Sequence, residues 1–221
     1  MANFETSTTD TRKAASAFST YDLALYAAVV FAWSLSWWPL KIQAAADVAP
    51  HVSLVWRFLA SGALMLVWCV LDRQPMRFSA NTHLRFASLG ILLFSTNFLL
   101  FYLGSDRLPS GLLSVVFSLA SIINAVLVFT LFGERPGRAV VFGGLLGFAG
   151  LGLLFWPEIA GQDYSWSVIA AIGLCVGGTL SFCFGNMVSA DNRKHGLPLL
   201  PMTCYGMFYG ALWCALLATV L

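Results

Sequence analysis

The sequence predicts an all-α protein, a polytopic bundle of transmembrane helices. Of its 221 residues, 59% are hydrophobic and only 10% are charged, whereas about 25% of the residues in an ordinary soluble domain are charged. A helix needs roughly 20 apolar residues to cross the hydrocarbon core of a bilayer, and runs of about that length recur along the chain. This composition argues against a water-soluble enzyme and makes the lipid bilayer the first expected partner.

Seven apolar runs are predicted to span the membrane. None carries a continuous charged face, and lipid tolerates only helices or closed barrels. The polar segment 1–20 is expected to be a cytoplasmic tail, because a signal peptide ending at the first small-residue cluster would be far longer than the usual roughly 15–30 residues. The runs are Leu23–Leu40, Leu54–Leu71, Phe86–Ser105, Leu108–Gly133, Ala139–Pro157, Tyr164–Ala190 and Gly196–Leu221.

The distribution of basic residues predicts the orientation. With the N-terminus in the cytoplasm, nine Lys and Arg residues fall inside and only Lys41 and Arg107 fall outside, as the positive-inside rule requires. A net charge of +2 provides no basic excess for nucleic acid. The inside residues are Arg12, Lys13, Arg73, Arg77, Arg85, Arg135, Arg138, Arg193 and Lys194.

A weak internal repeat suggests the domain organisation. Residues 21–157 would form a five-span unit, and residues 158–221 would form the first two spans of a second unit. An odd number of spans per unit inverts the second copy, as in many secondary transporters. Chance also explains so few matches in apolar sequence. A shift of 148 positions superimposes Pro50 on Pro198, Gly62 on Gly210, Ala63 on Ala211 and Leu64 on Leu212.

One face of the first predicted span carries candidate solute-binding residues. Trp33, Trp37 and Lys41 recur at four-residue intervals and therefore share one side of a helix. The two indole rings could stack on an organic solute as the wall of a cavity. The alternative is an interfacial aromatic belt with a lysine that extends to the membrane surface.

Three further polar residues lie inside predicted spans. Arg57 is the only charge well within a span, at a cost of roughly 2.5–3.5 kcal/mol on translocon scales. It would contact substrate, extend to the outer surface, or pair with Asp47 or Asp106. Asn97 and Asn124 lie near mid-membrane, where an unsatisfied amide is costly, and each needs an interhelical hydrogen bond, a water or a ligand.

The connection around Glu134 is expected to be structural. Pro136 fits the first position of a new helix, which would place Glu134 beside exposed N–H groups, with Arg135 or Arg138 alongside. No catalytic, metal or cofactor site is expected. The chain has no HExxH or GxSxG motif, its three His residues are far apart, and its five Cys residues form no CxxC pair.

Several short motifs resemble the five-span EamA unit of the drug/metabolite transporter superfamily. The resemblance covers Tyr21 to about Trp156, and Tyr102, a residue of these motifs, completes the candidate solute-binding set. This sequence departs from the family pattern with Ser34 in place of the usual Gly. The motifs are Trp33-Ser34, Lys41, Pro50, Arg57-Phe58, Tyr102-Leu103-Gly104, Leu108-Pro109, Gly111 and Gly133-Glu134-Arg135, followed by a glycine-rich fifth span.

The resemblance implies a multi-pass carrier in the cell membrane that exports or exchanges small organic metabolites such as amino acids. It also implies ten spans in two inverted units around a central cavity. Counterparts of the last three spans are absent up to Leu221, so a longer chain, a homodimer or a partner subunit would complete the second unit. The alternative function is a non-transporting membrane scaffold or a fragment of a transporter.

Overall fold

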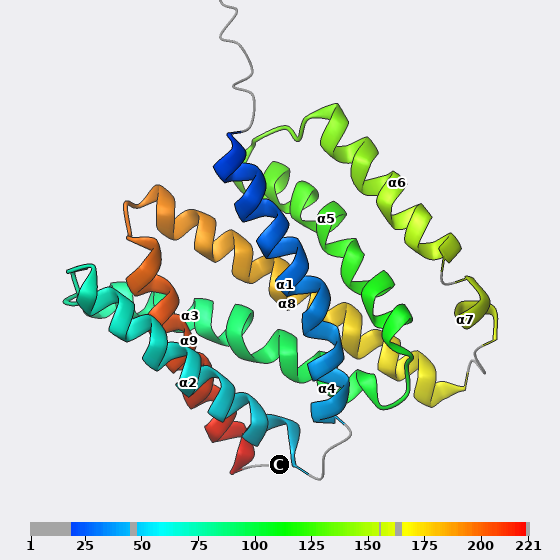
Figure 1. The fold of residues 1–221 in the computed structure, drawn as a ribbon, viewed down its shortest axis with the longest axis horizontal. Coiled ribbons are helices and arrows are strands. Elements are labelled where there is room, and N and C mark those ends of the chain that lie inside the picture. Colours follow the sequence, from blue (N-terminus) through cyan, green and yellow to red (C-terminus); the bar gives the residue numbers. More distant parts are fainter. Residues whose placement is uncertain (1–18, 45–47, 155, 162–164, 220–221) are drawn as a thin grey trace, which may run out of the picture. The chain divides into compact units, whose positions relative to one another are not determined.

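The computed structural model describes residues 19–44, 48–154, 156–161 and 165–219. Within these ranges the secondary structure is helical throughout, without a strand, which confirms the predicted all-α class (Figure 1). The chain divides into a first unit, residues 1–39, and a second unit, residues 40–221. Each unit is described by itself.

Helix α1, Thr20–Ala44, makes up the described part of the first unit and continues into the second. Its beginning is capped locally, because the backbone N–H of Ser19 donates to the Asp22 carboxylate at 3.1 Å. The negative charge of Asp22 also favours the first turn, where backbone N–H groups have no intrahelical acceptor.

The second unit contains eight further α-helices and one π-helical segment in its described part. Proline lies at several of the helix starts: Pro50 is the first residue of α2, and Pro109 and Pro198 are the N-caps of α5 and α9. Proline suits this position because its missing N–H would have no helical partner. The elements are α2 (Pro50–Leu71), α3 (Ala80–Ile91), η1 (Leu92–Thr96), α4 (Asn97–Ser105), α5 (Ser110–Phe132), α6 (Arg138–Leu154), α7 (Trp156–Ala160), α8 (Trp166–Lys194) and α9 (Leu199–Ala218).

Among the described residues, five helical segments are long and apolar enough to cross a membrane, and the sequence predicts seven spans. The continuous segment Ala80–Ser105, which joins α3, η1 and α4, counts as one of the five. The first and fifth predicted spans correspond to α1 and α6, where the described residues supply the apolar stretches Thr20–Leu35 and Arg138–Leu154.

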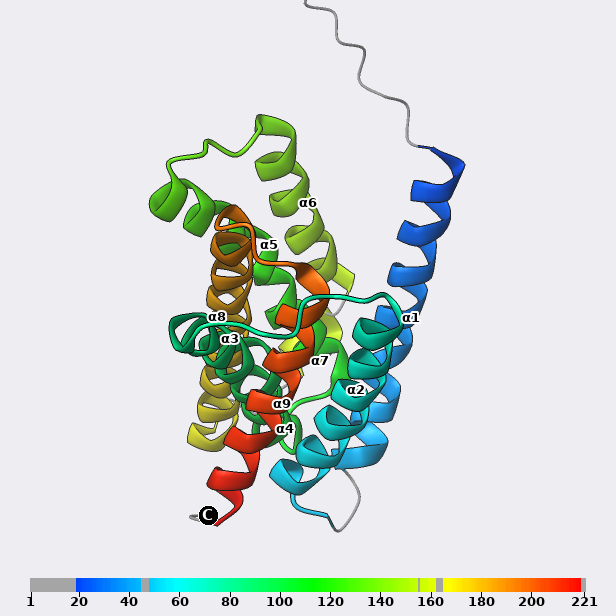
Figure 2. The ribbon, with the colours of Figure 1, turned by 90° about the vertical axis from the view of Figure 1, so that its left-hand side faces the viewer.

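The second unit is organised around long antiparallel contacts. Helix α2 runs along α9 in the opposite direction, and the α3–η1–α4 segment packs against both α8 and α9 (Figure 2). Helix α8 also packs against α5, and α5 packs against α6. The C-terminal ends of α2, α5 and α8 therefore share one side with the N-terminal ends of α3, α6 and α9 (Figures 1 and 2). We call this side the basic end, because it collects Arg73, Arg77, Arg85, Arg135, Arg138, Arg193 and Lys194.

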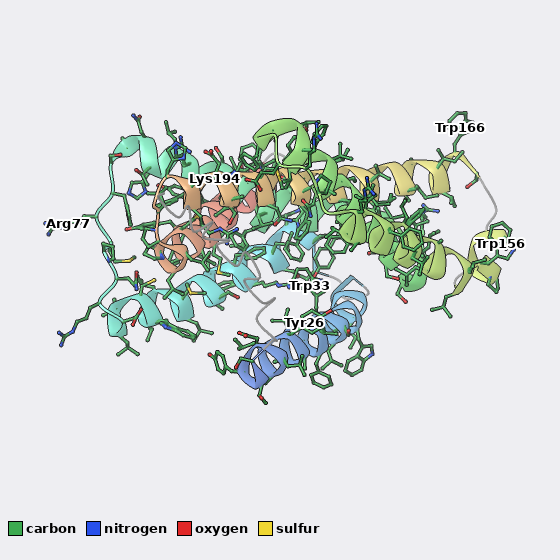
Figure 3. The ribbon with its side chains drawn as sticks, turned by 90° about the horizontal axis from the view of Figure 1, so that it is seen from above. Tyr26, Trp33, Arg77, Trp156, Trp166 and Lys194 are labelled. Carbon is green, nitrogen blue, oxygen red and sulfur yellow. The ribbon has the colours of Figure 1, made fainter. Side chains whose placement is uncertain are left out.

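The buried core of the second unit lies between the long helices, whereas large apolar side chains also face outward. One core cluster joins α2, α4 and α9 around Leu54, Phe58 and Tyr102. Trp156 and Trp166, far from the basic end, project away from the helices (Figure 3). Outward-facing apolar side chains are expected where the surrounding solvent is lipid.

Candidate solute-binding site

The Arg57 side chain is surrounded by aromatic rings. It is half-buried on the second turn of α2, and its guanidinium carbon lies 4.7 Å from the ring centroid of Phe98 and 5.8 Å from that of Phe58. At such distances a guanidinium is attracted to the face of an aromatic ring, which contributes about 0.5–2 kcal/mol depending on desolvation. Among the described residues, these rings contact the charge and no carboxylate forms an ion pair with it.

Tyr102 belongs to the same site. It lies one turn after Phe98 on α4, is buried, and interacts electrostatically with Arg57. Phe58 packs against Phe94 and Phe98 with ring centroids 5.8 and 5.5 Å apart. The structure thus brings together two of the seven predicted site residues, Arg57 and Tyr102. It adds Phe94 and Phe98, aromatic neighbours that the sequence did not single out.

The expected ion partners of Arg57 are not confirmed. Asp106 forms no ion pair with Arg57 among the described residues, and Asp47 lies outside the described residues. Asp106 is an exposed residue at the C-terminal cap of α4, whereas Arg57 is half-buried against Phe58 and Phe98.

Asn97 and Asn124 each carry a buried amide oxygen without a hydrogen-bond partner among the described residues. The interhelical hydrogen bond that the sequence suggests is therefore not formed by these oxygens. Asn97 is 4% exposed, and its backbone carbonyl lies 3.0 Å from a Cβ built on Gly178 of α8. The side chains of Asn97 and Phe98 leave α4 in directions about 100° apart around the helix axis, since a helix has about 3.6 residues per turn.

The three remaining predicted residues lie on α1. Trp33 is exposed in that helix, whereas the side chains of Trp37 and Lys41 lie outside the described residues. Their expected place in a cavity wall stays a prediction.

A π-helical segment next to the site is a feature that the sequence did not predict. Between Leu92 and Thr96 the helix widens, and the Ser95 hydroxyl donates to the carbonyls of Gly90 and Ile91 at 3.0 and 2.9 Å. The Ser181 hydroxyl of α8 donates to the Leu92 carbonyl at 2.9 Å. Single π turns inside α-helices are frequent at functional sites. A serine within an apolar span is the only sequence signal for it.

Two ion pairs join elements at the basic end. Arg85 of α3 contacts Asp191 of α8 at 2.6 Å, and Lys194 of α8 contacts Glu134 at 2.7 Å. The ion pair of Glu134 is with Lys194, and no ion pair among the described residues joins it to Arg135 or Arg138, which the sequence places alongside it. The helix also begins at Arg138 and not at Pro136, after Gly133 has ended α5 with a φ of 69°.

The described residues contain no group of three or more His, Cys, Asp and Glu side chains that could hold a metal ion. All five cysteines are free and buried. The chemistry available at the Arg57 site is recognition of charge and of aromatic surface.

The fold and the site together define a multi-pass helical membrane protein with a cationic, aromatic site inside its helix bundle. The model of the EamA-like transporter family matches residues 21–156, more than half of the chain, and the chain therefore belongs to this family. A membrane transporter is the general function that membership supports. No curated protein and no solved structure matches the chain.

Proposed function

We propose that this protein is a secondary transporter that exports or exchanges small organic metabolites such as amino acids. The observation that carries the proposal is Arg57, whose guanidinium lies 4.7 Å from the Phe98 ring and beside Tyr102. A guanidinium binds a carboxylate through two parallel hydrogen bonds, and aromatic faces take up the apolar part of a solute. The site thus suits an amphipathic solute with a carboxylate.

The other predicted residues would complete the solute cavity. The unpartnered Asn97 oxygen would accept a hydrogen bond from the ammonium or hydroxyl group of the solute, and Asn124 would act similarly. Trp33, Trp37 and Lys41 would form a wall contributed by α1.

The proposed organisation follows the internal repeat. Residues 21–157 would form the first five-span unit and residues 158–221 the start of an inverted second unit. The protein would lie in the cell membrane, with residues 1–20 as a tail in the cytoplasm. Helices α2 and α9, which contain the matching residues Gly62 and Gly210, pack antiparallel. Of the matching prolines, Pro50 is the first residue of α2 and Pro198 is the N-cap of α9. This arrangement supports the repeat. A homodimer or a partner subunit would complete the second unit.

Exchange of radiolabelled amino acids in proteoliposomes tests this function. We expect Arg57→Gln to reduce uptake at subsaturating solute at least tenfold, which corresponds to about 1.4 kcal/mol. Arg57→Lys should retain part of the activity because the charge remains but the planar fork is lost.

Arg107→Gln is the matched control, because Arg107 is an exposed cation in the turn after α4 and should leave uptake within about twofold of the wild type. Full activity in Arg57→Gln would contradict the assignment of the site. Absence of exchange for every amino acid in the intact protein would favour the alternative, a membrane scaffold.

A further inference from the structure

A groove of about 460 Å³ opens at the basic end, away from the Arg57 site. It lies between α3–η1, the end of α5 and the end of α8, and its volume is within the usual roughly 300–1,000 Å³ of small-molecule sites. Phe132, Phe184 and four aliphatic or methionine side chains form its apolar wall, and Arg85, Ser88, Asp191 and Asn192 form its polar side. The groove is therefore amphipathic.

Asn192 lines this groove and carries a buried hydrogen-bond donor without a partner among the described residues. The residue is fully buried, and its amide oxygen accepts from Nη1 of Arg85 at 3.4 Å. That bond fixes the orientation of the amide, so that Nδ2 is the atom without a partner among the described residues. A buried donor without an acceptor costs about 1–3 kcal/mol. An oxygen atom placed next to Nδ2 would recover this energy.

Arg85 adds donors on the same side of the groove. Its Nη1 donates both to Asp191, at 2.6 Å, and to Asn192. The remaining N–H groups of the guanidinium donate to no protein atom among the described residues. A guanidinium has five donors in a fixed plane, so Arg85 can hold Asp191 and a second acceptor at once.

The positive charge around the groove favours an anion as the ligand that accepts hydrogen bonds from Asn192 and Arg85. The basic end carries seven Lys and Arg residues, whereas its described carboxylates are Asp72, Glu134 and Asp191, of which the last two are already in ion pairs. Such an excess of one sign raises the local concentration of ions of the opposite sign. The Glu134–Lys194 pair also positions the groove wall, because the Lys194 ammonium lies 3.8 Å from the Phe132 ring centroid.

We propose that this groove is a second binding site, specific for a small amphipathic anion whose oxygen atoms contact Asn192 Nδ2 and Arg85 and whose apolar body lies against Phe132 and Phe184. The site is separate from the Arg57 site and does not depend on the transport function.

Protection of an engineered thiol tests the proposal in the purified protein. Ser88 lines the groove and is exposed, whereas the native cysteines are buried, so a maleimide should react mainly with the S88C thiol. In phosphatidylcholine nanodiscs, we expect saturating octanoate to slow this reaction at least fivefold. Octanol and octylamine at equal concentration have the same chain without the anionic oxygens and should leave the rate within twofold.

Variants of the polar side decide whether the assigned residues hold the anion. In the S88C background, Arg85→Gln and Asn192→Leu should each raise the half-protecting octanoate concentration at least tenfold. Arg193→Gln removes the same charge at the same end outside the groove and should change it less than twofold. Equal protection by octanol, or unchanged protection in Arg85→Gln, would overturn the proposal. If Asn192→Leu fails to fold, Arg85→Gln and Arg193→Gln decide the outcome.

A lipid phosphate and a free carboxylate share this chemistry, and the membrane composition separates them. Protection by phosphatidylglycerol nanodiscs without octanoate, lost in Arg85→Gln, would support the site with a lipid headgroup as its anion. Protection by octanoate alone would support the site with a free solute. Transport by the Arg57→Gln variant is measured separately, so a failure of the transport proposal leaves this result interpretable.

Discussion

Arg57 is stabilised by Phe58 and Phe98, and within the described part of the chain it forms no ion pair with a carboxylate. Aromatic faces stabilise a cation without requiring a second buried charge, whose desolvation costs several kcal/mol. The sequence identifies Arg57 as exceptional because it is the only charge deep within an apolar run. It cannot identify the neighbours, because Phe98 and Tyr102 come from another helix and their contact depends on how α2 and α4 pack.

Gly90 is a residue at which the packing of backbone against backbone leaves almost no room for a side chain. A Cβ at this position would lie 2.5 Å from the Gly206 carbonyl oxygen and 2.8 Å from the Gly210 nitrogen, both in the backbone of α9. We expect Gly90→Ala to destabilise the protein by about 1–3 kcal/mol, since the backbone cannot move aside cheaply. Thermal unfolding in detergent can be followed with a thiol-reactive dye, because the five cysteines are buried until the protein unfolds.

Gly147→Ala is the matched control for this prediction. Gly147 lies in α6, where a Cβ would meet no neighbouring atom within 4 Å, so alanine should be neutral or should stabilise the helix by up to about 1 kcal/mol. Similar unfolding temperatures for both variants would show that α3 and α9 do not approach as closely as described.

The sequence predicts that the α3–η1–α4 segment spans the membrane, but it does not predict the π turn within this segment. Its position as a span follows from hydropathy, and the structure confirms it as Ala80–Ser105. The π turn at Leu92–Thr96 has no counterpart in the apolar pattern. It depends on Ser95 bonding to two carbonyls of its own helix and on Ser181 bonding to a third, and Ser181 is distant in sequence.

The turn between α5 and α6 makes a testable contact with α8. The Glu134 and Lys194 side chains form an ion pair at 2.7 Å but are 61% and 47% exposed, so water and salt weaken the pair. A double-mutant cycle with Glu134→Gln and Lys194→Gln should give a coupling energy of about 0.2–1 kcal/mol in low salt. The coupling should fall in 1 M salt, where the Debye length is about 3 Å.

The equivalent cycle between Glu134→Gln and Arg193→Gln provides the control. Arg193 is the adjacent basic residue and forms no described ion pair, so we expect no measurable coupling. A coupling of the same size would mean that the turn responds to the general charge of the basic end and not to Lys194.

The sequence predicts the class of the whole molecule, a helical membrane protein, but not the ends of its helices. High apolar content and repeated runs predict a multi-helix membrane protein, and the five long helices confirm it. The runs do not predict where each helix begins, since the third run begins at Phe86 whereas α3 begins at Ala80. Local composition records the hydrophobicity of a segment, whereas helix ends also depend on turns and tertiary contacts.

The gathering of basic residues predicts the topology of the molecule. Ser79, at the start of α3, should lie in the cytoplasm, and Ser165, at the start of α8, should lie outside, because the basic end faces inward under the positive-inside rule. A membrane-impermeant maleimide applied to intact cells should label Ser165→Cys and not Ser79→Cys. Both should be labelled after permeabilisation, and the reverse pattern in intact cells would contradict the topology.

The antiparallel contact between α2 and α9 bears on the order of events during synthesis. A Cβ on Gly62 of α2 would lie 3.2 Å from the Phe208 ring of α9, and Gly90 approaches Gly206 and Gly210 even more closely. The ribosome therefore delivers α2 and α3 into the membrane long before their main packing partner exists. Until α9 is inserted, the glycine-lined faces of α2 and α3 meet lipid or the insertion machinery, and these faces are covered only after Leu199–Ala218 has been made.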